Sequence, residues 1–146
     1  MTAAGYKAYK KVLVSGTEED KGKLLLRLFN GALTSACFAR RGIEEKSPKM
    51  RGESISRILA ILTELDCALD REAGGSLAEN LSGLYAYMTQ RLTVANIRND
   101  ISALEEVKTL LTELKEGFEN AVAATHKPMA SNREADPAGR RMSFAV

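Results

Sequence analysis

The sequence predicts an all-α fold, an antiparallel up-down four-helix bundle with a short N-terminal segment and a disordered C-terminal tail. Apolar residues recur three and four positions apart over long stretches, which is the spacing of one helix face. The only three prolines, at positions 48, 128 and 137, interrupt none of these stretches. The connections between the stretches are short, so consecutive helices should be antiparallel neighbours.

The first predicted helix begins at Thr17 or Asp20, because either side chain can cap a helix N-terminus, and it runs to about Arg41. Gly42 is interpreted as its stop signal. The polar segment 44–49 is then the loop that leads to the next helix.

The second predicted helix runs from about Arg51 to Arg71. Gly74 and Gly75 follow it and predict a tight turn, because only glycine enters left-handed backbone conformations at low cost. The predicted core stripe of this helix consists of Ile55, Ile58, Leu59, Leu62, Leu65 and Leu69.

The third predicted helix spans residues 76–98. Ser76 and Glu79 have the spacing of a capping box, in which the serine oxygen accepts from a free backbone N–H and the glutamate reaches back. Its apolar face consists of Leu77, Leu81, Leu84, Met88, Leu92 and Ala95.

The fourth predicted helix follows a turn at Asn99 and Asp100, and the Asp100 side chain can cap it. It ends near Ala124. Its apolar residues alternate three and four apart, as in the seam of a helical bundle, and are Leu104, Val107, Leu111, Leu114, Phe118 and Ala121.

Three units are therefore predicted: an N-terminal segment of residues 1–16, the bundle of residues 17–124 and a tail of residues 125–146. Periodicity stops after Thr125. The tail is predicted to be disordered because it cannot bury enough apolar surface to offset the entropy lost on ordering.

Composition excludes several functions. The chain of 146 residues is 45% hydrophobic, enough for one domain with a single core. The basic residues of the tail exceed its acidic ones by the whole net charge of +2, so the rest of the chain, residues 1–124, is neutral and should bind nucleic acid poorly. The only histidine, His126, falls in the predicted tail, which makes it unsuitable as a positioned general base, and no phosphate-binding loop is present. We expect no enzyme activity and no cofactor.

Cys37 and Cys67 are predicted to be small buried thiols on the apolar faces of two helices, in a reducing compartment. Two cysteines and one histidine cannot supply the usual four zinc ligands, so we expect no metal site. The N-terminus lacks the apolar stretch of a signal peptide, and no apolar run approaches the roughly 20 residues that span a bilayer. These features predict a cytosolic protein without membrane insertion.

Several apolar residues exceed what a plain bundle needs: Leu24, Leu25, Leu26, Leu28, Phe29, Ile61, Tyr85 and Tyr87. Broad apolar faces on the inner helices would explain them. An apolar groove that is open to a partner helix is the alternative explanation. Tyr85 and Tyr87 differ by about 200° around a helix, so at most one can be a central core residue.

Several segments resemble the FliS family of flagellin-specific export chaperones. The third predicted helix carries the family's leucine–tyrosine–x–tyrosine–methionine pattern at residues 84–88, then Arg91-Leu92 and Ala95-Asn96. Other matching segments are Tyr6-Lys7-Ala8-Tyr9, Leu28-Phe29-Asn30-Gly31, Glu64-Leu65, Leu69-Asp70, Gly74-Gly75, Leu104-Glu105-Glu106-Val107 and Leu110-Leu111. The chain departs from the family at residues 18–21, which replace its usual threonine/serine-proline, and at Phe118, which replaces its usual tryptophan.

The resemblance implies a cytosolic, ATP-independent chaperone. Such a protein binds the C-terminal region of flagellin, prevents its premature polymerisation and delivers it to the gate of the flagellar type III export apparatus. Some members of that family also contact flagellar regulatory proteins, and the resemblance leaves such partners open for this chain. Monomer and homodimer both remain open. The alternative, from a different class, is a helical adaptor or regulatory protein that binds another partner helix.

The resemblance further implies a set of flagellin-binding residues: Tyr6, Tyr9, Leu28, Phe29, Leu84, Tyr87, Met88, Leu92 and Asn96. Tyr6 and Tyr9 resemble a family segment that lies over the groove when no client is bound. They could alternatively clasp the bound client.

Overall fold

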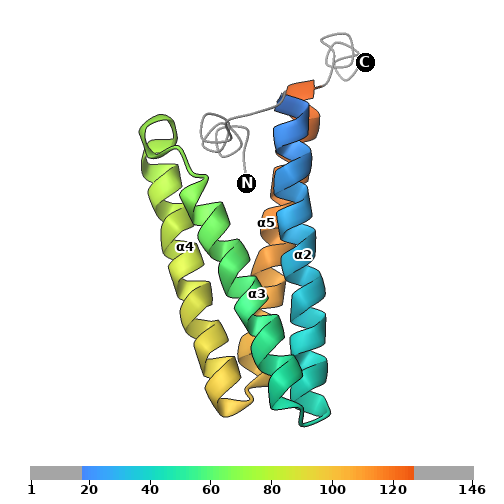
Figure 1. Cartoon of the computed structure of the whole chain (residues 1–146). Helices are drawn as coiled ribbons and strands as arrows, with labels where there is room; N and C mark the ends of the chain where they lie inside the picture. The colour runs from blue at the N-terminus through green and yellow to red at the C-terminus, as the bar shows by residue number, and fades with distance from the viewer. Residues whose placement is uncertain (1–17, 127–146) are drawn as a thin grey trace, which may run out of the picture.

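The structure, a computed structural model, describes residues 18–126, and the predicted N-terminal segment and nearly all of the predicted tail lie outside this range. The described chain consists of α2 (Glu18–Glu44), α3 (Pro48–Cys67), α4 (Arg71–Arg98) and α5 (Ile101–His126). Consecutive helices run antiparallel (Figure 1). The predicted all-α, up-down four-helix bundle is therefore confirmed.

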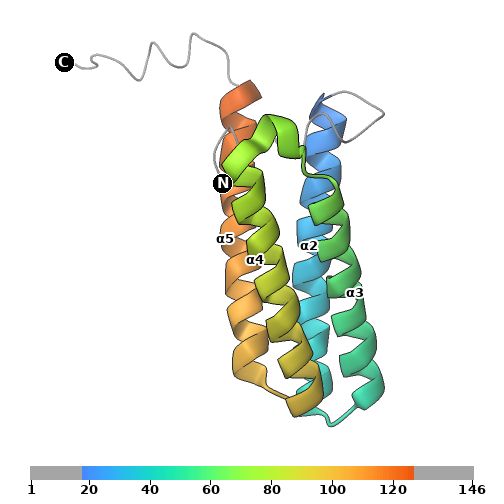
Figure 2. The same ribbon diagram turned by 90° about the vertical axis from the view of Figure 1, so that its left-hand side faces the viewer.

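Each helix packs on two neighbours. α2 contacts α3 and α5, and α4 contacts the same two helices from the other side. Figure 2 shows the resulting arrangement, in which the α2–α3 and α4–α5 connections lie at one end of the bundle. We call this the turn end. The opposite end, where α2 begins, α5 ends and α3 connects to α4, is the wide end.

The core follows the predicted stripes closely in α5 and less closely in α4. All six residues predicted for the α5 seam are buried. In α4, Ala78 and Tyr85 are buried, whereas the predicted Leu77 and Leu84 are only partly buried. The predicted Leu81, Met88, Leu92 and Ala95 are buried, so the core face of α4 differs from the prediction only where Ala78 and Tyr85 replace Leu77 and Leu84. Tyr85 is 2% exposed and Tyr87 is 41% exposed, which confirms that only one of these tyrosines enters the core.

The connection between α2 and α3 differs from the prediction at Gly42. α2 continues through Gly42 to Glu44, so Gly42 is not a stop signal. A Cβ atom at this position would lie only 2.5 Å from the backbone nitrogen of Arg51, so glycine is required by the close approach of α3. Lys46, two residues beyond the end of α2, has a left-handed φ of 57°. The Ser47 N–H donates to the Gly42 carbonyl at 2.8 Å and the Lys46 N–H to the Ile43 carbonyl at 3.2 Å, as in a Schellman motif.

α3 begins one turn earlier than predicted because Ser47 caps it. The Ser47 Oγ accepts from the Met50 N–H at 3.2 Å, and Pro48 occupies the first turn, where its missing N–H costs no hydrogen bond. Serine followed by proline is a recognisable start signal, so this boundary was available from the sequence.

The second predicted helix was expected to reach Arg71, but α3 ends at Cys67. Asp70 caps the next helix, since its Oδ1 accepts from the N–H groups of Glu72 at 3.1 Å and Ala73 at 3.0 Å. α4 therefore begins before the predicted capping box, and no hydrogen bond within residues 18–126 joins Ser76 to Glu79. Gly75 does adopt the predicted left-handed φ, at 52°, where it kinks the first turns of α4.

The α4–α5 turn is as predicted. Asn99 has a left-handed φ of 53°, and the Asp100 Oδ1 accepts from the Ala103 N–H at 3.1 Å. α5 continues to His126, two residues beyond the predicted end, so His126 belongs to a helix rather than to the tail.

The prediction of buried thiols is wrong, because Cys37 and Cys67 are both exposed. Cys37 follows the buried Ala36 and is therefore turned by about 100° from the core face. Within residues 18–126, no helix has the apolar length required to cross a lipid bilayer. Across the same part of the chain, no three histidine, cysteine or acidic side chains gather closely enough to hold a metal ion.

Candidate partner-binding surface

The two ends of the bundle are filled by side chains of different size. At the turn end several small buried residues, Ala36, Ala39, Ser54, Ala95 and Ala103, lie among larger ones such as Ile55, Leu92 and Leu104. At the wide end the buried residues are mostly large: Leu25, Phe29, Leu65, Leu81, Tyr85 and Phe118. In Figure 1 the α3–α4 hairpin accordingly leans away from α2 and α5 towards the wide end.

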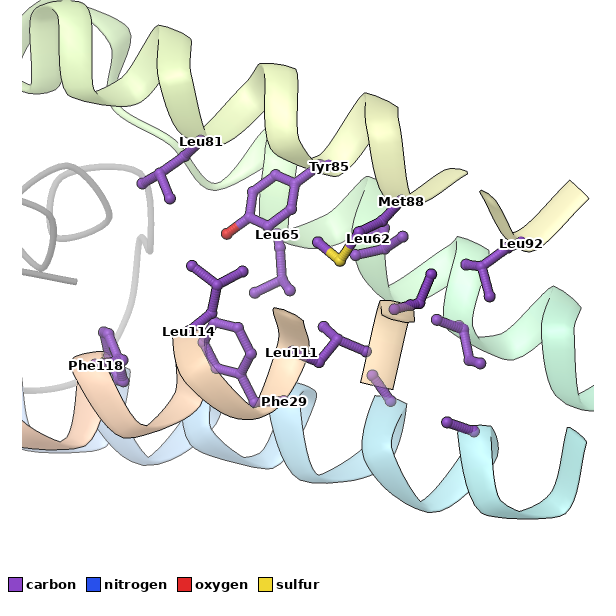
Figure 3. Close-up of a cluster of buried hydrophobic side chains, with 14 of the residues drawn as sticks. Phe29, Leu62, Leu65, Leu81, Tyr85, Met88, Leu92, Leu111, Leu114 and Phe118 are labelled. Carbon is purple, nitrogen blue, oxygen red and sulfur yellow. The ribbon is translucent and has the colours of Figure 1, made fainter. Parts of the chain in front are cut away.

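Large side chains from all four helices meet at the wide end. Figure 3 shows Tyr85 of α4 pointing towards Leu114 of α5, with Leu81 of α4 and Leu65 of α3 on the same side of the cluster. The rings of Phe29 and Phe118 pack with centroids 5.9 Å apart and an interplanar angle of 42°. Tilted aromatic pairs of this kind contribute about 0.5–1.5 kcal/mol beyond the burial of their area.

Some of the predicted binding residues lie inside this core. Phe29, Met88 and Leu92 are fully buried. A partner could reach these three side chains only if the helices moved apart, so in the structure they stabilise the bundle. Tyr6 and Tyr9 lie outside the described residues.

Leu28 and Leu84 are partly buried and lie on different edges of the bundle. Leu28 is one turn before Gly31, at which a Cβ would lie 3.4 Å from the Ile61 side chain, so Leu28 belongs to the edge between α2 and α3. Leu84 is one turn before Tyr87, which bonds to a residue of α5. The structure therefore does not bring the predicted residues together on one surface.

Tyr87 takes part in a hydrogen-bonded group that joins α4 to α5. Its hydroxyl donates to Glu106 Oε2 at 2.5 Å, and Arg91 Nε donates to Glu106 Oε1 at 2.8 Å. The hydrogen bond from Tyr87 lowers the pKa of Glu106, with a further lowering by Arg91. The same hydrogen bond to Glu106 raises the pKa of the Tyr87 hydroxyl, because it stabilises the protonated phenol.

Asn96 contacts α3 instead of facing a groove. Arg51 Nε donates to Asn96 Oδ1 at 2.9 Å, and a terminal nitrogen of the same guanidinium donates to Asn99 Oδ1 at 2.7 Å. Arg51 thereby ties the first turn of α3 to the last turn of α4. Sequence reasoning missed this role because the partners are 45 and 48 residues apart.

Of the apolar residues in excess of a plain bundle, Leu25, Phe29 and Tyr85 are buried in the core, whereas others lie at the edge between α2 and α3. Leu24 is 42% exposed and lies two turns before Gly31 on the same helix face. Leu28 and Ile61 continue this surface as partly buried side chains. We call Leu24, Leu28 and Ile61 the α2–α3 apolar edge. It lies in the half of the bundle towards the wide end.

A four-helix bundle with an apolar helix edge is an architecture that can accept a partner helix. Comparison with known proteins identifies the family. The family model described as flagellar protein FliS matches residues 2–125. The chain therefore belongs to the FliS family, and the resemblance drawn from the sequence is confirmed.

Relatives of the chain carry consistent names. It is 40% identical over 120 residues to the flagellar secretion chaperone FliS of Salmonella typhimurium, an alignment that covers 80% of this chain and 89% of the relative. It is 38% identical over 115 residues to the flagellar secretion chaperone FliSB of Pseudomonas aeruginosa, covering 77% and 91% of the two chains. A third relative, FliS of Bacillus subtilis, is 30% identical over 122 residues, covering 84% and 89%.

Proposed function

We propose that this protein is a flagellar secretion chaperone that binds the C-terminal region of flagellin in the cytosol and prevents its premature polymerisation. Membership of the FliS family is the observation that carries the proposal, because the relatives from Salmonella typhimurium and Pseudomonas aeruginosa are named flagellar secretion chaperones. The role is that of a holding chaperone, without catalysis, ATP or a bound cofactor.

The α2–α3 apolar edge is the surface that we assign to flagellin. An amphipathic helix binds such a surface by placing apolar side chains one turn apart along it. Leu24 and Leu28 are four residues apart on α2, so they match that spacing. Ile61 on the neighbouring helix widens the surface.

The other predicted binding residues divide into two groups. Leu84 and Tyr87 form a second contact on the α4–α5 edge, where flagellin would reach them only by wrapping around the bundle. Phe29, Met88, Leu92 and Asn96 act indirectly, by fixing the helices whose edges the client binds. Tyr6 and Tyr9 cover the client surface in the free protein or clasp the bound client.

Binding of this kind couples association to folding of the client. A disordered segment that becomes helical on binding loses roughly 2–5 kcal/mol of the gross interaction to ordering. The remaining affinity would hold flagellin without preventing its release. We propose that release occurs at the flagellar type III export gate, to which the chaperone brings its client.

Isothermal titration calorimetry with two flagellins tests the proposal. We expect full-length monomeric flagellin to bind with a clearly negative heat-capacity change, because binding buries apolar surface. Flagellin that lacks its last few dozen residues should not bind. Equal binding of both flagellins would contradict the proposal and favour the alternative, an adaptor for another helix.

A pair of variants tests the surface. Leu24→Ser combined with Leu28→Ser should weaken flagellin binding at least about tenfold, because two apolar contacts are lost. Ile97→Ser is the matched control, since Ile97 is 74% exposed and lies on the last turns of α4. Flagellin affinity that falls equally in both variants would refute the assignment of the α2–α3 apolar edge.

A further inference from the structure

We infer that the turn end carries a second docking site, which takes a segment of another protein with one aromatic or aliphatic side chain flanked by carboxylates. The site is a hollow of about 400 Å³ between α2 and the first turns of α3. It lies on the same pair of helices as the α2–α3 apolar edge but at the opposite end. Phe38 is ten residues beyond Leu28, which is about 15 Å along a helix.

Phe38 and Met50 supply the apolar part of the lining. Phe38 is 42% exposed, although its neighbour Ala39 is fully buried. Phe38 lies one turn before Gly42, which meets α3. Its ring is therefore directed along the edge between α2 and α3 and not into the core. Methionine is flexible and polarizable, so Met50 can adapt to side chains of different shape.

Ser54 gives the site a buried polar group whose hydroxyl has no partner within residues 18–126. It lines the hollow and is only 2% exposed. No hydrogen bond of the described chain uses the Ser54 hydroxyl, whereas the hydroxyls of Thr63 and Thr112 bond to backbone carbonyls one turn earlier. A buried hydroxyl without a partner is unfavourable, and a carbonyl or carboxylate oxygen from a bound segment would accept its hydrogen bond.

Two cations flank the apolar lining. Lys49 and Arg57 both border the hollow, and neither has a carboxylate within 4.0 Å among residues 18–126. The nearby acidic residues are already used, because Arg40 pairs with Glu44 and Glu105. Glu53 is the single carboxylate in the lining, so the acidic groups of a bound segment should flank its apolar side chain towards Lys49 and Arg57.

The positive charge of Lys49 and Arg57 determines which segment can bind in the hollow. A second copy of the chain, docked through the same hollow, would bring Lys49 and Arg57 against their own equivalents. The chain's own C-terminal residues are basic, with Arg140 and Arg141 beside Met142 and Phe144, and would also be repelled. An acidic segment of a different protein is attracted, which makes it the favoured partner.

Fluorescence anisotropy with a labelled peptide tests the inference on the full-length protein. The probe has a single phenylalanine between two runs of four glutamates. One control peptide replaces the phenylalanine with alanine, and another replaces the glutamates with lysines. We expect saturable binding of the probe alone, with an affinity that falls as salt is raised.

Variants locate the site. Phe38→Ala should weaken the probe at least about tenfold, as expected for a central apolar anchor. Ile97→Ala, an exposed residue outside the hollow, is its matched control and should bind normally. Lys49→Glu with Arg57→Glu should also weaken the probe about tenfold, whereas Lys108→Glu with Lys115→Glu on α5 should not. Thermal melts confirm that each variant is folded.

The inference is overturned if the probe shows no saturable binding or binds as its alanine control does. It is equally overturned if Phe38→Ala and Ile97→Ala bind alike. These results are independent of flagellin, because flagellin binding depends on Leu24 and Leu28. A Phe38→Ala variant that keeps flagellin affinity and loses the probe would support two separate sites.

Discussion

The turn end and the wide end of this bundle are held together in different ways. At the turn end, small side chains let the helices approach, and specific polar contacts such as Arg51 with Asn96 and Asn99 lock them. At the wide end, bulky residues such as Phe29 and Phe118 fill the space between helices that lean apart. Where two helix backbones approach closely, a larger side chain does not fit. A core of bulky apolar side chains can instead exchange one apolar contact for another. The wide end is therefore the better place for a client that competes for apolar surface.

The largest expected effect is at the wide end. Phe29→Ala removes a fully buried aromatic side chain and its contact with Phe118, so it should lower the free energy of unfolding by about 3–5 kcal/mol. Ala36→Gly, at a fully packed position towards the turn end, should cost only about 1 kcal/mol through helix propensity. Urea denaturation measures both. A cost of less than about 1 kcal/mol for Phe29→Ala would contradict the tight aromatic packing described for the wide end.

The next effect tests close approach at the turn end. Gly42→Ala places a methyl group 2.5 Å from the Arg51 backbone nitrogen, so α2 and α3 must separate, at a cost of about 1–3 kcal/mol. Gly52 is the matched control, because a Cβ there meets nothing within 4 Å. Gly52→Ala should stabilise α3 by about 0.5–1 kcal/mol. Thermal melts that change in the same direction for both variants would contradict the role given to Gly42.

The α5 seam, the Asp100 cap and Gly42 show which features of the fold the sequence predicts and which it does not. The α5 seam and the Asp100 cap were predicted because an uninterrupted periodicity and a capping side chain are local signals. Gly42 was read as a helix end because a glycine that permits close packing looks the same in a sequence as a glycine that ends a helix. The difference lies in Arg51, which belongs to another helix.

The candidate site was predictable only in part, for a related reason. The family resemblance gives the role of the protein but does not separate residues that touch a partner from those that hold the bundle. Leu28 and Phe29 are adjacent in the sequence, yet one is partly exposed at an edge and the other is fully buried. Phe38 could have been found, because it lies off the helical stripe of core residues.

A smaller effect is expected from the hydrogen bonds that Arg51 donates to Asn96 and Asn99 at the turn end. Asn96→Ala removes the acceptor for Arg51 Nε and should destabilise the fold by about 1 kcal/mol, since the guanidinium keeps Asn99 and solvent as partners. Flagellin affinity, measured by calorimetry at a temperature where the variant is folded, should stay unchanged. A selective loss of affinity without loss of stability would instead make Asn96 a direct client contact.

Lys46 offers a change of opposite sign at the same end. It has a left-handed φ of 57° without being glycine, which is a strained conformation for a side chain with a Cβ. Lys46→Gly should relieve this strain in the folded state, although glycine also increases the entropy of the unfolded chain. The net effect should be a stabilisation of about 0.5 kcal/mol. Lys49→Gly, at a helical position nearby, should be destabilising. A lower melting temperature for Lys46→Gly would show that the lysine side chain makes a compensating contact.

The smallest effect is expected from Tyr87 and Glu106, which lie between the two ends on exposed surface. Because the folded pKa of Glu106 is lowered, its contribution to stability is present above the pKa of the unfolded chain and is lost as pH falls through the folded pKa. Because the folded pKa of Tyr87 is raised, its contribution is present below the unfolded pKa and is lost as pH rises through the folded value. The hydrogen bond should therefore be intact across neutral pH.

Tyr87→Phe should raise the pKa of Glu106 towards its ordinary value, which carboxyl NMR titration measures. Arg91 keeps its ion pair with Glu106 in this variant, so the pKa should remain somewhat low. An unchanged Glu106 pKa in Tyr87→Phe would show that Arg91 alone sets it, and that Tyr87 is free to turn towards a partner.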